Sequence, residues 1–394
     1  TMRRQAARAS QNWIFDNFIQ LTDNEDILHP GIMGIRLERG FKYGDMERIF
    51  RAVTGRRAFP RAWAKGADRQ KELAEEAMTA GHKVTAAQHY HRAALYYGRA
   101  QHLIPVKGNA KKNAYHAAVV ENYDKFIDLM GGEITRMVIP FENGKNVYAL
   151  FHKAAGEGAK PTVLYLPGMD AIKEDSPNPY NNEFTRRGMN ICVMDGPGQG
   201  ECNINEVWQE VGNYARAGKA VIDELVKRAD VDSDKIAVFG TSMGSRYSVE
   251  IGAYDDRVKA VVGQMANVGP TDVIFNQAQP NFKRIYMYMT DISDEAEFDK
   301  FADAMDENFM ASGDALKCAY LLVAGEMDEL TPPEDVHAWL DRLNGPKELW
   351  MYEDVFHPMG EVAADIYPGI ADWIADVLEK GLPDGHDLRR EIVP

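Results

Sequence analysis

Apolar residues in the first third of the chain recur at three- and four-residue spacings. This periodicity predicts helices at 64–81, 85–103 and 111–130, and glycines follow each of them. We therefore expect residues 1–130 to form an all-helical domain.

The pattern changes after Gly132. Short apolar runs bounded by turn residues predict strands, and longer amphipathic stretches predict helices. We expect strands at 134–140, 147–152, 162–166, 191–194, 236–239, 258–262, 319–323 and 348–352, and helices at 207–228, 245–254, 333–343 and 360–380. Asn143-Gly144 predicts a hairpin between the first two strands.

Alternation of strands and helices is typical of a mostly parallel sheet with helices on both faces. We therefore expect an α/β domain over residues 131–394, with an eight-stranded sheet and an antiparallel hairpin at one edge. Residues 266–316 lie between two core strands and are helix-rich with aromatic residues. They are expected to form a helical insertion that acts as a cap.

The composition of the chain bears on which partners and which location are expected. The chain has 394 residues, a hydrophobic fraction of 45% and a formal net charge of −15. A nucleic-acid partner is not expected, because phosphate binding needs a basic surface. No apolar run reaches transmembrane length, so no membrane association is expected. The cysteines, Cys192, Cys202 and Cys318, are far apart, which fits a reducing, cytoplasmic location.

The segment Gly240-Thr241-Ser242-Met243-Gly244 lies between a predicted buried strand and a predicted helix. Strand, G-x-S-x-G and helix in this order form the nucleophile elbow of the α/β-hydrolases. The glycines allow a tight turn that lifts the serine hydroxyl above the sheet. Ser242 is therefore the predicted nucleophile.

A serine nucleophile needs a base, and the base needs an orienting carboxylate. In this fold the order along the chain is serine, acid, histidine. Asp328 follows the strand at 319–323 and is the favoured acid, with Glu326 and Glu329 as neighbouring alternatives. His357 follows the last predicted strand and is the predicted base.

An oxyanion hole requires backbone N–H groups aimed at the developing negative charge. The N–H of Met243, directly after the nucleophile, is one expected donor. Met169 is the favoured second donor, with Asp170 as the alternative in the same loop. Asp170 and Asp272 are candidate substrate contacts, and a helix N-cap is the alternative role for Asp272.

Two further features of the sequence receive structural interpretations. The loop Asp195-Gly196-Pro197-Gly198-Gln199-Gly200-Glu201 lacks the order of a phosphate-binding motif and is expected to shape the fold beside the site. The histidines of the helical region are interpreted as core or solvated residues, and no metal site is expected; they are His82, His89, His91, His102 and His116.

In combination these motifs resemble the α/β-hydrolases with an N-terminal helical domain, the family of 2,6-dihydroxypseudooxynicotine hydrolase and of the fungal polyketide-shortening hydrolases. The resemblance covers about residues 45–380. It rests on the elbow, Gly81-x-x-x-Thr85-Ala86, Arg92-Ala93-Ala94-x-Tyr96-Tyr97-x-x-Ala100, Leu166-Pro167-Gly168-x-Asp170, Lys173-Glu174 and the Asp195–Glu201 loop.

The resemblance implies a triad of Ser242, Asp328 and His357, and a homodimer. It also implies hydrolysis of a C–C bond in a β-diketone or polyketide-like β-dicarbonyl, a small and often aromatic molecule, without a cofactor. Either Ser242 or a water activated by His357 attacks the carbonyl. A carboxylesterase or lactonase of the same fold is the alternative, and an inactive binding protein is the third possibility.

Overall fold

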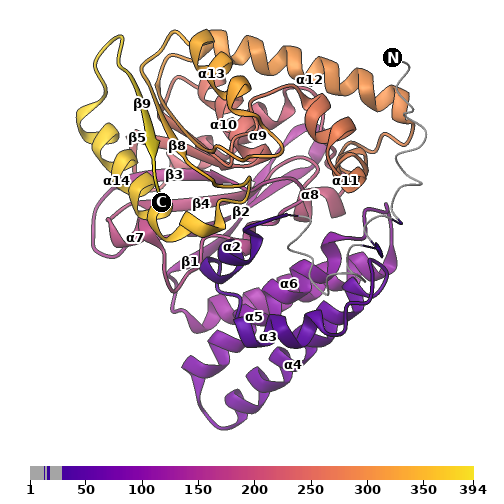
Figure 1. The fold of residues 1–394 in the computed structure, drawn as a ribbon. Helices are drawn as coiled ribbons and strands as arrows, with labels where there is room; N and C mark the ends of the chain where they lie inside the picture. The colour runs from indigo at the N-terminus through magenta and orange to yellow at the C-terminus, as the bar shows by residue number, and fades with distance from the viewer. Residues whose placement is uncertain (1–12, 14–15, 18–28) are drawn as a thin grey trace.

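The computed structural model of the chain describes residues 13, 16–17 and 29–394 (Figure 1). The beginning of the predicted helical domain, residues 1–12, 14–15 and 18–28, lies outside the described residues. Among the described residues, no helix is both long enough and apolar enough to cross a membrane.

Helices account for the first part of the described chain. They are α2 (Ile32–Glu38), α3 (Tyr43–Phe50), α4 (Phe59–Thr79), α5 (Lys83–His102) and α6 (Ala110–Leu129). The three helices predicted from periodicity correspond to α4, α5 and α6. These helices share an apolar core in which the side chains of Trp63, Tyr96 and Phe126 are fully buried. In Figure 1 they form a layer beside the sheet, with α2 between that layer and the rest of the molecule.

One sheet forms the centre of the remaining chain. Its strands are β1 (Ile134–Pro140), β2 (Asn146–His152), β3 (Lys160–Leu166), β4 (Asn190–Asp195), β5 (Val231–Thr241), β6 (Val258–Gln264), β7 (Ala319–Gly325), β8 (Lys347–Tyr352) and β9 (Asp387–Ile392). The strand order is β1-β2-β4-β3-β5-β6-β7-β8-β9. β1 pairs with β2, and β2 with β4, in antiparallel fashion, whereas all other pairs are parallel. The predicted hairpin at Asn143-Gly144 is the β1–β2 connection.

The prediction of eight strands was wrong, because the described residues form a nine-stranded sheet. The additional strand is β9, which pairs with β8 from Lys347↔Asp387 to Tyr352↔Ile392. Its sequence, Asp-Leu-Arg-Arg-Glu-Ile, is largely charged, and most of its side chains are exposed at the sheet edge. Backbone pairing with β8 holds this strand at the edge of the sheet. Its largely charged sequence has no apolar pattern from which a strand could be predicted.

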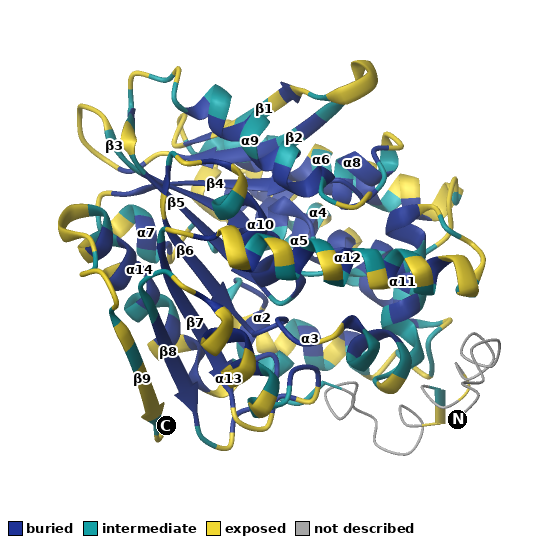
Figure 2. Cartoon of the chain, turned by 90° about the horizontal axis from the view of Figure 1, so that it is seen from above, coloured by how far each residue is buried: buried dark blue, intermediate teal, exposed yellow. Residues whose placement is uncertain are grey.

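Helices cover both faces of the sheet, as predicted. One face packs against α9 (Asn213–Leu225) and α10 (Met243–Tyr254), and the other packs against α7 (Glu183–Arg186) and α14 (Ala363–Lys380). The short helix α8 (Gly200–Ile204) and helix α13 (Pro333–Arg342) belong to the first face. In Figure 2 the central strands are almost entirely buried between these layers.

The insertion lies between β6 and β7, as expected. It contains a short π-helical turn (Val273–Gln277), α11 (Pro280–Thr290) and α12 (Glu295–Ala315). Helix α12 is fixed to α10 by an ion pair between the fully buried Arg246 and Asp306, with 2.6 Å between Nη2 and Oδ1. The insertion thereby covers the side of the molecule where β5 ends and α10 begins.

Candidate active site

Ser242 occupies a strained turn between β5 and α10. Its backbone has φ 54° and ψ −121°, a conformation that L-residues rarely adopt. A Cβ at position 240 would lie 1.9 Å from the carbonyl oxygen of Gly244, and one at position 244 would lie 2.3 Å from that of Leu166. The two flanking glycines are therefore required by close backbone packing, which confirms the geometric reason given for this motif.

Ser242, His357 and Asp328 are connected by hydrogen bonds. Ser242 Oγ lies 2.8 Å from His357 Nε2, and His357 Nδ1 lies 2.8 Å from Asp328 Oδ2. The other oxygen of Asp328 accepts hydrogen bonds from the N–H groups of Leu330 and Thr331, at 2.8 and 3.0 Å. Because Asp328 is held by its own loop, it can fix the orientation of the imidazole.

The surroundings of His357 favour its charged form. Burial opposes protonation of the imidazole, but the carboxylate of Asp328 and, more weakly, that of Glu329 outweigh it and raise the pKa of His357 above its ordinary value. An imidazolium formed when the serine loses its proton is therefore stabilised at this position. This is the behaviour needed of a base that later returns the proton.

Neither of the two alternative acids, Glu326 and Glu329, bonds the ring of His357. Glu326 accepts a hydrogen bond from the N–H of Asp354 at 3.2 Å. Glu329 accepts one from the backbone N–H of His357 at 3.2 Å and pairs with His29 at 3.1 Å. The carboxylate that bonds the His357 ring is that of Asp328.

The loop after β3 lies directly against Ser242. A Cβ at Gly168 would be 3.2 Å from Ser242 Cβ, and Met169 lines the same cavity as Ser242. Gln199 holds this loop by donating hydrogen bonds to the carbonyl oxygens of Pro167 and Gly168, at 3.3 and 2.8 Å. Met243, the first residue of α10, follows Ser242 directly.

The two predicted substrate contacts do not line this cavity. Asp170 is buried, with Oδ2 3.7 Å from Lys112 Nζ and 3.8 Å from His102 Nδ1. Burial raises the pKa of Asp170 to about 6. Asp272 accepts hydrogen bonds from Asn276 and Gln277, both at 2.9 Å, and precedes the π-helical turn.

A cavity of about 190 Å³ opens onto Ser242 and His357. Its walls come from α2, α5, the loops after β3, β6, β7 and β8, and the insertion. The remaining lining residues are His29, Ile32, Ile35, Arg36, Arg39, Arg99, His102, Leu103, Gly168, Met169, Ala171, Asp175, Thr241, Met265, Ile274, Gln279, Asn281, Phe282, Leu330 and Pro358.

Sequence reasoning missed the contribution of α2 and α5 to this cavity. Arg36 and Arg39 are three residues apart in and after α2, and Arg99 and His102 are three apart on α5. Their spacing places each pair on one helix face. His102 was interpreted as a core or solvated residue, whereas it faces the cavity. Polar residues three apart, and hence on one helix face, were the available signal.

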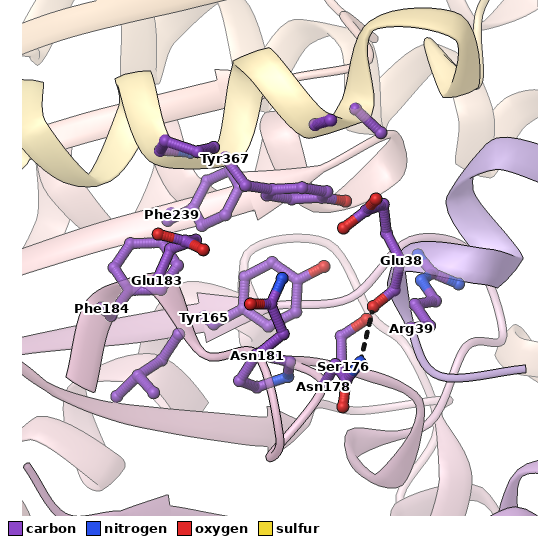
Figure 3. Close-up of a pocket in the computed structure, with 15 residues that line it drawn as sticks. Glu38, Arg39, Tyr165, Ser176, Asn178, Asn181, Glu183, Phe184, Phe239 and Tyr367 are labelled. Carbon is purple, nitrogen blue, oxygen red and sulfur yellow. Dashed lines mark hydrogen bonds between the residues drawn. The ribbon is translucent and has the colours of Figure 1, made fainter. Parts of the chain in front are cut away.

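A second cavity of about 150 Å³ lies between α14, α7 and the loop after β3 (Figure 3). Arg39 lines both this cavity and the one at Ser242. Tyr165 also lines the second cavity, and its hydroxyl is 3.0 Å from the hydroxyl of Thr241, which directly precedes Ser242. The second cavity itself does not include Ser242 or His357.

The loop Asp195–Glu201 takes part in a buried charge network beside the site. Lys173 Nζ lies 2.8 Å from Asp195 Oδ2, 3.0 Å from Glu174 Oε1 and 2.5 Å from Glu201 Oε2. Arg136 adds contacts to Glu201 and Glu174. Lys173 and Glu174, two residues of the resemblance motifs, are therefore part of this network. No group of three or more His, Cys, Asp or Glu side chains in the described part of the chain could hold a metal ion.

Several proteins of similar sequence or structure are named as hydrolases. Alpha/beta hydrolase gkaG of Penicillium citrinum is 26% identical over 57% of this chain, which matches 55% of that protein's length. The 2,6-dihydropseudooxynicotine hydrolase of Paenarthrobacter nicotinovorans is 27% identical over 81% of this chain and 84% of its own. The crystal structure of 2,6-dihydroxy-pseudo-oxynicotine hydrolase superposes with a TM-score of 0.79 at 24% identity, covering 90% of this chain and 99% of the other.

The fold and the sequence lead to the same family. The mostly parallel sheet, the elbow at the end of β5 and the helical region before β1 give the chain an α/β-hydrolase fold. The family model described as Esterase FrsA-like matches residues 47–306, more than half of the chain. The chain therefore belongs to the FrsA-like esterase family.

Proposed function

We propose that this protein is a hydrolase in which Ser242 is the nucleophile, His357 the base and Asp328 the orienting acid. The observation that carries the proposal is the unbroken series of hydrogen bonds from Asp328 through His357 to Ser242. A serine hydroxyl becomes an effective nucleophile only when an oriented base accepts its proton. The strained turn and the cavity in front of it give that hydroxyl access to a small molecule.

The proposed substrate is a β-diketone or a polyketide-like β-dicarbonyl, cleaved at a C–C bond. Ser242 Oγ adds to one carbonyl carbon while its proton moves to His357 Nε2. The C–C bond then breaks with its electron pair retained by the leaving enolate, and His357 returns the proton to the enolate carbon. Water hydrolyses the remaining acyl-serine, so the products are a carboxylic acid and a ketone. Similarity to 2,6-dihydropseudooxynicotine hydrolase over most of the chain supports this class.

The N–H groups of Met243 and Met169 are the proposed oxyanion donors. Met243 begins α10, so the positive end of the helix dipole also faces the developing charge. Met169 belongs to the loop that packs on Ser242 and is held by Gln199. Loss of one such donor costs about 10²–10³ in rate in serine hydrolases.

Ester hydrolysis is the second candidate, and the family description supports it. The same nucleophile, base and oxyanion donors would cleave a carboxylic ester or lactone, whose alkoxide leaving group is easier to expel than a carbanion. The fold does not select between these bonds. The products of the reaction distinguish C–C cleavage from ester cleavage.

We also propose that residues 1–130 serve as a cap domain on a hydrolase domain over 131–394. Helices α2 and α5 support this, because they contribute one wall of the cavity at Ser242. Substrate selection would then be a property of the helical region, and the bond-breaking chemistry a property of the sheet.

Product analysis by mass spectrometry tests the proposal. Aryl 1,3-diketones and aryl esters of similar size are incubated with the wild-type protein and with Ser242→Ala. Acid plus ketone from the diketones, absent with the variant, is the expected result. Cleavage of the esters alone would replace the proposed reaction by that of an esterase. Turnover by Ser242→Ala at the wild-type rate would overturn the assignment of the nucleophile.

A further inference from the structure

The loop after β3 makes a turn from Gly168 to Ala171. The N–H of Ala171 donates to the carbonyl oxygen of Gly168 at 3.1 Å, and Gln199 donates to the same oxygen at 2.8 Å. A peptide group is planar and trans, so its N–H points opposite to its C=O. The two bonds to Gly168 therefore also fix the direction of the Met169 N–H, the proposed oxyanion donor.

The turn depends on the backbone conformation of Asp170. Its φ is 47°, in the left-handed region, at a turn position that glycine or asparagine usually occupies. Residues other than glycine adopt this conformation at a cost, which aspartate bears better than most because its short side chain can make local contacts. The contacts of the Asp170 side chain therefore bear on whether the turn is kept.

Lys112 is the cation at this side chain. Its Nζ lies 3.7 Å from Asp170 Oδ2, and both side chains are buried. The same ammonium group donates hydrogen bonds to Oε1 and to the carbonyl oxygen of Gln101, at 2.5 and 3.3 Å, and lies 4.8 Å from the centroid of the Tyr288 ring. One buried side chain on α6 therefore connects α5, helix α11 of the insertion and the loop after β3.

The other ionisable groups around Asp170 do not replace this cation. His102 Nδ1 lies 3.8 Å from Asp170 Oδ2, but burial keeps the pKa of His102 well below its ordinary range, so the ring is neutral near pH 7. Burial raises the pKa of Asp170 to about 6, the charges of Asp195 and Asp175 add to that rise, and Lys112 opposes it. Asp170 is therefore mostly ionised at pH 7, with Lys112 as the strongest favourable charge beside it.

We propose that Lys112 is a positioning residue for the oxyanion hole: by pairing with Asp170 it keeps the turn over 168–171 and hence the direction of the Met169 N–H. The inference rests on the proposed function, because it concerns how a proposed oxyanion donor is placed. Neither Lys112 nor Asp170 lines the cavity at Ser242. The helical region then acts on the bond-breaking step itself, in addition to forming a wall of the cavity.

The rate at which a fluorophosphonate labels Ser242 tests this inference for either candidate bond. Ser242 Oγ bonds to phosphorus, its proton moves to His357, and fluoride leaves with the electrons of the P–F bond, while oxyanion donors stabilise the phosphoryl oxygen. Lys112→Met should slow labelling about tenfold or more, toward the ~10²–10³ of a lost donor. Lys111→Met, an exposed neighbour on the same helix, is the matched control and should label at the wild-type rate.

Two double variants separate the conformation of the turn from the cost of an unpaired buried carboxylate. Lys112→Met with Asp170→Gly removes both charges and leaves a residue that adopts a positive φ freely, so labelling should return toward the wild-type rate. Lys112→Met with Asp170→Ala removes the same charges but keeps the cost of that conformation, so labelling should stay slow. Circular dichroism checks that each variant is folded.

A kinetic measurement complements the labelling. With the substrate that product analysis identifies, Lys112→Met should lower kcat and kcat/KM by the same factor, because the lost interaction is made only in the transition state. A rise in KM with unchanged kcat would overturn the inference.

The labelling outcomes distinguish this inference from the proposed function. Labelling of folded Lys112→Met at the wild-type rate, or equal rates in the two double variants, would overturn the inference and leave Ser242 as the nucleophile. Absence of labelling in the wild-type protein would refute the proposed nucleophile and, with it, this role of Lys112.

Discussion

The carboxylate of Glu329 accepts a hydrogen bond from the backbone N–H of His357, with 3.2 Å between Oε2 and N. Its other oxygen lies 3.1 Å from Nδ1 of His29, a residue that lines the cavity. The rings of His29 and His357 are themselves 5.7 Å apart. Glu329 therefore links the loop that carries the proposed base to a second imidazole, while Asp328 bonds the ring of that base.

Removal of the Glu329 charge should change the pH dependence of activity. Burial disfavours its ionisation, but the hydrogen bond with His29 and the nearby His357 lower the pKa of Glu329 to about 2, so it is ionised throughout the working range. That charge helps to raise the pKa of His357. In Glu329→Gln the amide oxygen can still accept the His357 N–H bond, and the acid limb of the kcat/KM profile should move to lower pH.

The matched control is Glu326→Gln. Glu326 lies in the same loop, but its carboxylate bonds the N–H of Asp354 and not His357. The acid limb of the kcat/KM profile of Glu326→Gln should coincide with that of the wild type. Coincidence of the Glu329→Gln profile with the wild type as well would show that Glu329 has no electrostatic effect on the base.

Asp328→Asn should reduce kcat by about 10⁴-fold, as expected when an imidazole loses its orienting carboxylate. Protein folding should be retained, because the amide oxygen can still accept the N–H bonds of Leu330 and Thr331. Steady-state kinetics with circular dichroism measure both effects. A loss of this size in Glu326→Gln, with near-normal activity in Asp328→Asn, would reassign the acid.

The apolar pattern predicted the sheet and the main helices because these elements bury regular faces. It failed for β9, whose residues are mostly charged and exposed and which joins the sheet by backbone pairing with β8. It also gave no expectation for the short helix α2, which supplies Arg36 and precedes Arg39. The order of strand, loop and helix placed Ser242, Asp328 and His357 because chain order fixes which loops meet at the carboxyl edge of a parallel sheet.

The cavity wall was harder to predict, since it depends on how separate elements pack. Asp272 was a candidate substrate contact from its position after β6, but its side chain bonds Asn276 and Gln277 within its own turn. Glu329 was considered only as a competitor of Asp328, because hydrogen bonds to a backbone N–H in another loop leave no periodic signal. Such contacts join residues far apart in sequence.

Gln199 should act as a positioning residue for the loop that carries the proposed oxyanion donor Met169. Its amide donates to Pro167 and Gly168, and its carbonyl accepts from the hydroxyl of Tyr214 at 2.6 Å. Gln199→Leu frees the loop, so kcat should fall by up to ~10²–10³-fold, the range for a lost oxyanion donor, with a smaller change in KM. Gln209→Leu, another buried glutamine with no hydrogen bond to that loop among the described contacts, is the control. A change in KM alone, with kcat unchanged, would contradict this role.

The buried His152 should make the protein less stable in mild acid. Its side chain is 3% exposed on β2, and burial lowers its pKa to about 4, against about 6.5 for an unfolded chain. Between these values the unfolded state binds more protons, so this residue reduces the free energy of unfolding as pH falls, by up to ~1.4 kcal/mol per pH unit. His152→Asn cannot take up that proton. Denaturant unfolding of both proteins from pH 7 to pH 4 measures their free energies of unfolding. The variant should be less stable at neutral pH, and the difference between the two free energies should shrink toward acid pH. A constant difference would show that His152 is protonated equally in the folded and unfolded states.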